Sequence, residues 1–127
     1  MSNEHIGCST CCLMDRPLEE ALGLISGQTG LAEILSDGPH SLFLSEEACY
    51  SFDLRYTVHA PVADTNIASD NERLRRATLR VIRDLAEVCD RIGAERLVIH
   101  PGHVWGEEVQ VAAQAALDRS LNELAAV

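Results

Sequence analysis

Four short apolar runs alternate with longer segments of helical periodicity along this chain of 127 residues. The runs cover residues 6–9, 31–35, 55–59 and 96–100. Such alternation is typical of consecutive βα units, in which successive strands lie parallel in one sheet. The sequence therefore predicts an α/β fold with parallel βα units, in a single domain spanning residues 1–127.

The helix expected after the third run has the clearest pattern. Ser69 and Glu72 match a capping box, and Gly93 is the left-handed residue expected just past the last turn. One apolar face recurs at helical spacing, and most arginines and aspartates lie elsewhere; the face comprises Leu74, Val81, Leu85, Val88 and Ile92. Further helices are expected over residues 15–27 and 107–124, and one or two helical turns near Ser45.

The composition indicates which kinds of partner the protein binds and in which cell compartment it is expected. Ten Lys and Arg residues stand against 20 Asp and Glu, a net charge of -10 that disfavours phosphate backbones and favours small molecules or proteins. No apolar run approaches the roughly 20 residues that span a bilayer. The first residues, MSNEHIG, lack the features of a signal peptide. We therefore expect a cytoplasmic protein without membrane association.

The five cysteines are an odd number without a secretory signal, so we expect reduced thiols. The segment GCSTCC, which holds Cys8, Cys11 and Cys12, contains a C-x-x-C motif. A structural zinc site needs a second ligand pair, which the sequence does not offer. Packing and loop cysteines are the favoured interpretation.

Two strands are expected to end on a histidine that a proline soon follows. His59 precedes Pro61, and His100 precedes Pro101. The ends of parallel strands meet at one edge of the sheet, where neighbouring strands lie about 5 Å apart. The two imidazoles are therefore candidates to share a metal or an anion, with His103 within reach. The competing interpretation is a pair of strand-end histidines with capping or packing roles.

The segment around these histidines resembles a known family. The H-x-P-x-x-x-x-N-x-A-S arrangement, followed by a helix, RIGA and VIHPG, is similar to the third and fourth βα units of xylose isomerase-like TIM barrels; its residues are His59, Pro61, Asn66, Ala68 and Ser69. That family joins sugar and sugar-phosphate isomerases and epimerases to zinc-dependent apurinic endonucleases. The resemblance implies zinc ligands at His59 and His100 in the endonucleases. In the sugar isomerases it implies metal ligands chiefly from later strands, while the first half lines the substrate pocket.

A complete barrel of this type has eight βα units in about 250 residues, whereas four are recognised here. We expect the N-terminal half of a TIM (β/α)8 barrel, present as a truncated product, a fragment of a longer protein, or a half-barrel that pairs. Because such a half leaves sheet edges and one sheet face uncovered, self-association or a missing C-terminal half is expected.

Three classes of function follow. The first is a sugar or sugar-phosphate isomerase or epimerase, in which a divalent metal (zinc, manganese or magnesium) polarises the substrate while a carboxylate moves a proton. The acidic composition favours it. The second is a zinc-dependent phosphodiesterase like the apurinic endonucleases, the alternative that involves nucleic acid. The third is a non-catalytic half-barrel or assembly module. Activity is expected of the full-length barrel; this chain alone is expected to bind metal weakly or not at all and to be inactive.

Three further residues are candidates for substrate binding. Glu33 shares a strand face with Leu31 and Leu35 and suits a hydroxyl-rich ligand, although a solvated strand end is an equal interpretation. For Asn66, fixing the turn through side-chain to backbone hydrogen bonds is favoured over contact with a ligand. Trp105 suits stacking on a sugar or base, against the commoner role of covering a loop. The catalytic residues remain unknown from the sequence.

Overall fold

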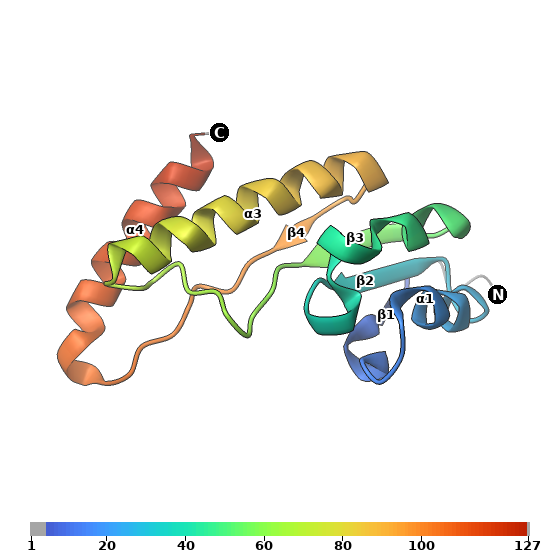
Figure 1. Cartoon of the computed structure of the whole chain (residues 1–127), viewed down its shortest axis with the longest axis horizontal. Coiled ribbons are helices and arrows are strands. Elements are labelled where there is room, and N and C mark those ends of the chain that lie inside the picture. The colour runs from blue at the N-terminus through green and yellow to red at the C-terminus, as the bar shows by residue number, and fades with distance from the viewer. Residues whose placement is uncertain (1–4, 127) are drawn as a thin grey trace. The chain divides into compact units, whose positions relative to one another are not determined.

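The parallel sheet predicted from the apolar runs is present in the computed structural model, which describes residues 5–126 (Figure 1). Its strands run parallel in the order β1-β2-β3-β4 and comprise β1 (Cys8–Ser9), β2 (Leu31–Leu35), β3 (Arg55–His59) and β4 (Leu97–Val98). The helices are α1 (Leu18–Ser26), α2 (Leu42–Ser45), α3 (Glu72–Ile92) and α4 (Gln110–Ala125). Short 3₁₀ turns η1 (Thr10–Leu13), η2 (Gly38–His40), η3 (Glu46–Ser51) and η4 (Glu107–Val109) complete the elements. The α/β class is confirmed.

The two central strands occupy the ranges predicted for them, whereas both edge strands are shorter than predicted. Residues 6–9 contribute only Cys8 and Ser9 to β1, and Ile6 is 66% exposed. Residues 96–100 contribute only Leu97 and Val98 to β4. An edge strand has a hydrogen-bonding partner on one side only, so less of it is held in the ladder.

The residues divide into two compact units. The first comprises the residues up to Pro61 with Leu85–Val98 and contains the whole sheet. The second comprises Val62–Asp84 and the residues from Ile99 onward. In the described part of the chain, no helix combines the length and apolarity needed to cross a membrane.

The two faces of the sheet in the first unit differ in burial, as the alternation of the strands predicts. Ala32, Ile34, Tyr56 and Val58 are buried on one face, where α1 contacts β2. The opposite face is half-buried and more polar, and the register places Ser9, Glu33 and Thr57 side by side across β1, β2 and β3. Full burial of a side chain such as Ile34 or Val58 stabilises the fold by about 1.5–3 kcal/mol. The polar face is therefore available for contacts other than the core.

The ends of α3 agree with the prediction on one side only. Gly93 has a φ of 70° just past the last turn, as expected of a C-terminal left-handed residue. At the other end the predicted capping box of Ser69 and Glu72 is wrong. The Asn71 side chain accepts from the N–H groups of Arg73 (3.1 Å) and Leu74 (3.4 Å), so Asn71 caps the helix.

Candidate functional site

Asn66 ties the loop after β3 to the loop after β4 in the second unit. Its Oδ1 accepts from the backbone N–H of Ala68 (3.0 Å) and of His103 (3.2 Å), and its Nδ2 donates to the His103 carbonyl (2.9 Å). The Asn66 N–H itself donates to Thr78 Oγ1 of α3 at 3.2 Å. The expected turn-fixing role of Asn66 is thus confirmed, and it extends to a second loop 37 residues away in the sequence.

Gly102 allows these two loops to approach each other. Its φ is 97°, in the left-handed region that favours glycine. A Cβ at this position would collide with Asn66 Oδ1 and would lie 2.9 Å from Ala68 Cβ. The HPG segment therefore supplies the one residue type that lets Asn66 reach the His103 backbone.

A cavity of about 420 Å³ lies within the second unit and has three of the predicted site residues on its walls. These residues are Asn66, His103 and Trp105. The lining also includes Asp64 and Asp70, and most of the wall is apolar, formed by Leu74, Ala77, Val81, Val104, Val109 and Ala113. Cavities of this size accommodate small organic ligands. In the described structure, no lysine or arginine lines this cavity.

Trp105 is 92% exposed, so its indole is not packed over the loop as a covering side chain would be. The His103 ring meets the indole edge to face, with ring centroids 5.8 Å apart and an interplanar angle of 89°. An exposed indole presents an apolar face and an N–H donor to a ligand. The pair is therefore the most accessible aromatic feature of the cavity wall.

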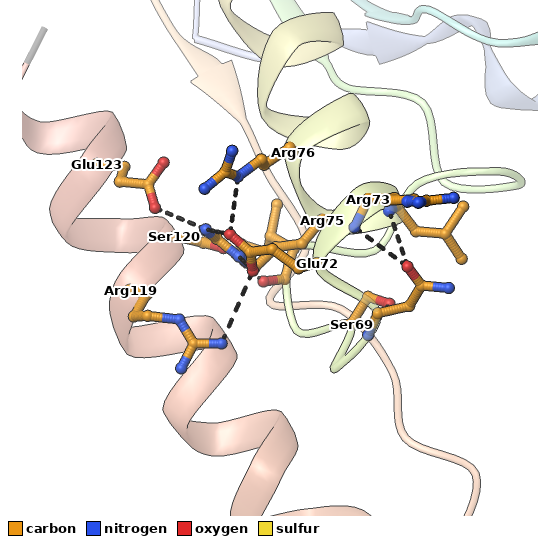
Figure 2. A network of polar contacts seen from close by, with 11 residues as sticks. Ser69, Glu72, Arg73, Arg75, Arg76, Arg119, Ser120 and Glu123 are labelled. Atoms are coloured by element: carbon orange, nitrogen blue, oxygen red, sulfur yellow. Dashed lines mark hydrogen bonds and ion pairs between the residues drawn. The ribbon is translucent and has the colours of Figure 1, made fainter.

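A buried arginine of α3 is hydrogen-bonded to α4 in the second unit (Figure 2). Arg75 is 1% exposed and donates to Glu72 (2.8 and 2.7 Å), to Glu123 (2.7 Å) and to Ser120 Oγ (3.0 Å). Ser120 in turn donates to the carbonyl of Ile67, in the Asn66 loop, at 2.6 Å. A chain of hydrogen bonds thus runs from α3 through α4 to the loop that holds His103.

This network was not predicted. The sequence pattern places most arginines of α3 off its apolar face, and it places Leu74 on that face. The structure shows the reverse, because Arg75 is buried and Leu74 is 59% exposed. The spacing of Glu72, Arg75 and Arg76 is the local signal that could have indicated half of the network.

The carboxylate of Glu72 is held by more than one cation. Hydrogen bonds from Arg75 and then Arg76 lower the pKa of Glu72 from its ordinary 4.5 to about 2. The Arg75 guanidinium, held first by Glu72 and also by Glu123, has its pKa raised. Both groups are therefore charged over the whole neutral range.

Glu33 and His59 belong to the first unit. Glu33 lies on the polar face of β2, as predicted, and accepts a hydrogen bond from Ser9 Oγ at 3.3 Å. His59 ends β3, is half-buried, and its Nδ1 donates to the carbonyl of Ala60 at 2.8 Å. His100 follows β4 in the second unit and is exposed. The residues predicted to bind metal are thus divided between the two units, with His100 and His103 in one and His59 in the other.

The metal expected from the resemblance has no complete ligand set in residues 5–126. No three His, Cys, Asp or Glu side chains gather there in a way that could hold a metal ion. A catalytic zinc site takes three protein ligands and an open position. We therefore assign no chemical step to a metal on these residues, and the metal site stays a prediction.

Comparison with known proteins relates the chain to one family. The family model described as xylose isomerase-like TIM barrel matches residues 40–127. An uncharacterized protein of Methanocaldococcus jannaschii, MJ1614, is 32% identical over 123 residues, which cover 94% of this chain and 49% of that protein. A second uncharacterized protein of that organism, MJ1311, is 36% identical over 77 residues, 57% of this chain and 26% of that protein.

A solved structure supports the same relationship. The crystal structure of a D-tagatose 3-epimerase-like protein matches with a TM-score of 0.77 and 28% sequence identity, and the match covers 93% of this chain and 46% of that one. The chain therefore spans about half the length, or less, of the relatives and the solved structure that it matches.

Proposed function

Because this chain belongs to the xylose isomerase-like TIM barrel family, we propose that it works as part of a sugar or sugar-phosphate isomerase or epimerase. The fold resembles that of an epimerase-like protein. The acidic net charge of -10 supports a small-molecule substrate over a nucleic acid. The apurinic endonuclease-like alternative draws on the histidines His59, His100 and His103.

The cavity of the second unit is the observation that carries this proposal. A pyranose or an open-chain sugar has apolar C–H faces and hydroxyl edges. In our proposal the Trp105 indole takes an apolar face, and His103 with Asp64 and Asp70 takes hydroxyls. Two carboxylates in a lining without lysine or arginine among the described residues favour an uncharged sugar over a phosphorylated one.

Metal dependence is part of the proposal. In the full-length barrel a divalent ion is expected, and His59, His100 and His103 are each separate candidates to contribute a ligand from this chain. Glu33, in the first unit, is a separate candidate for a contact with a hydroxyl group, since it already accepts a hydrogen bond from the hydroxyl of Ser9. The acid and base that move the proton are not assigned to residues of this chain.

Binding by this chain can be tested through its own fluorescence, because Trp105 is its single tryptophan. We expect neutral ketoses and aldoses to change the Trp105 emission with dissociation constants of about 1 mM, and their phosphate esters to do so more weakly. His103→Ala should abolish the response. His5→Ala is the matched control, since His5 is exposed and lies outside the cavity. An emission that no sugar changes would contradict the assignment of the cavity.

Turnover is tested separately. We expect this chain to be inactive with zinc, manganese or magnesium on aldose and ketose pairs, and a protein that includes any coding sequence beyond Val127 to convert them. His59→Ala with His100→Ala should remove metal-dependent activity. Conversion by the 127-residue chain itself would contradict the ligand count. Cleavage of an abasic duplex would favour the phosphodiesterase alternative.

A further inference from the structure

Two cysteine thiols converge at the end of β1 in the first unit. Cys8 lies in β1 and Cys12 in the turn η1 that follows it. Both sulfur atoms donate to the same acceptor, the carbonyl of Ser9, at 3.8 Å for Cys8 and 3.3 Å for Cys12. Their sulfur atoms are therefore neighbours, although three residues separate them in the sequence.

The two thiols differ in their exposure. Cys12 is exposed, and Cys8 is half-buried. Burial, followed by the neighbouring Cys12 thiol, raises the pKa of the Cys8 thiol. Cys12 is thus the thiol that a soluble reagent meets first, and Cys8 is positioned to react second.

The remaining cysteines do not share this arrangement. Cys49 and Cys89 are buried, and burial raises the pKa of both, to about 12 and about 11. Cys11 is exposed, and its backbone N–H donates to Ser9 Oγ at 3.3 Å. Cys11 therefore offers the same accessibility as Cys12 in the same turn, and it serves as a matched control.

We propose that Cys8 and Cys12 form a redox-active dithiol that closes to an intramolecular disulfide on reaction with a small-molecule disulfide. The Cys12 thiolate attacks one sulfur of the reagent, releases one reduced thiol and leaves a mixed disulfide on Cys12. The Cys8 thiol then loses its proton and attacks the Cys12 sulfur, which releases the second reduced thiol. The two cysteines lose two electrons and two protons in total, and the reagent disulfide becomes two thiols.

The location gives this site a link to the candidate substrate residue Glu33. Ser9, whose carbonyl accepts from both thiols, also donates through its hydroxyl to Glu33 Oε1 at 3.3 Å. Cys8 is therefore the direct sequence neighbour of Ser9, whose hydroxyl is hydrogen-bonded to Glu33 on the polar face of the sheet. Closing the disulfide would remove the two thiol donors from the Ser9 carbonyl.

The experiment equilibrates the whole chain with mixtures of reduced and oxidised glutathione, followed by acid quench, intact mass measurement and peptide mapping. Proximity raises the effective concentration of the second thiol, so we expect the internal disulfide to exceed mixed disulfides on Cys8 and Cys12 by about tenfold or more. Its product is lighter by two hydrogens, and mapping should join Cys8 to Cys12. Far-ultraviolet circular dichroism checks that every variant is folded.

Three cysteine-to-serine variants separate the outcomes. Cys12→Ser and Cys8→Ser should lose the internal disulfide and carry glutathione on the remaining thiols instead. Cys11→Ser should form the internal disulfide as the unchanged chain does. A bond that maps to Cys11, or mixed disulfides without an internal bond in the unchanged chain, would overturn the proposal; mapping of the unchanged chain decides this even if a variant fails to fold.

Discussion

Asn66 holds His103 by both of its backbone polar groups, accepting from its N–H at 3.2 Å and donating to its carbonyl at 2.9 Å. One amide side chain thus replaces the pairing that a neighbouring strand would provide. His103, and Trp105 two residues further along the chain, line the cavity. Asn66 therefore fixes the backbone of the segment that carries both rings.

Asn66→Ala should destabilise the chain by about 2–3 kcal/mol, since it removes three hydrogen bonds and leaves the His103 N–H without that acceptor. Urea unfolding followed by circular dichroism measures the change. Asn122→Ala, at an exposed position of α4, should alter stability by less than about 0.5 kcal/mol. Equal effects of the two substitutions would contradict a special role for Asn66.

Gly102→Ala should cost about 1–3 kcal/mol, because alanine disfavours the φ of 97° and its Cβ meets Asn66 and Ala68. Gly30→Ala is the control: a Cβ at Gly30 meets no atom within 4 Å. Thermal unfolding of both variants gives the comparison. If Gly102→Ala unfolds at the temperature of the unchanged chain, the two loops do not require their close approach.

Arg75→Met should destabilise the second unit by about 3 kcal/mol, at the lower end for a broken buried ion pair, because Glu72 and Glu123 keep nearly half their side chains in water. Arg76→Met, whose side chain is mostly exposed, should cost less than about 0.5 kcal/mol. A double-mutant cycle with Ser120→Ala should show coupling, since Arg75 and Ser120 are hydrogen-bonded. Additive effects would contradict the network.

Stability should fall as the pH is lowered from about 5 towards 2. Glu72 and Glu46 each have a pKa of about 2 in the folded chain against an ordinary 4.5, Glu46 through Arg91 and then Tyr50. A carboxylate with a lowered folded pKa stabilises the fold above its unfolded pKa and loses that contribution as it is protonated. Urea midpoints across this range measure the effect.

Glu72→Gln separates this contribution from the general effect of acid. The variant should be less stable than the unchanged chain at pH 7, and the difference should shrink as the pH approaches 2. Glu47→Gln, an exposed neighbour of Glu46, is the control and should follow the unchanged chain. A difference for Glu72→Gln that stays constant with pH would exclude its ionisation as the cause.

The parts of the fold that could be predicted from the sequence are those set by local periodicity. The central strands and the C-terminal end of α3 follow from alternation and from Gly93, which act within a few residues. The burial of Arg75 depends on Ser120 and Glu123, which are 45 and 48 residues away in the sequence. No local pattern indicates such partners, so helical periodicity alone does not predict that Arg75 is buried.

The candidate site divides in the same way. Asn66 and His103 could be selected because the motif spacing marks the ends of two strands, and the cavity brings them together with Trp105. The cavity itself is lined by residues of both helices, Ala77 and Val81 of α3 and Ala113 of α4. Their packing is set by tertiary contacts, which an alanine-rich helical pattern leaves open.

The unequal lengths of the sheet ladders imply unequal rates of amide hydrogen exchange. β2 and β3 are paired over five residues, whereas β1 and β4 each pair over two. Detaching an outer strand breaks few bonds, so its amides should exchange with deuterium through small local openings. The amides between β2 and β3 should exchange only when the first unit opens as a whole, and their protection factors would then report its global free energy of unfolding.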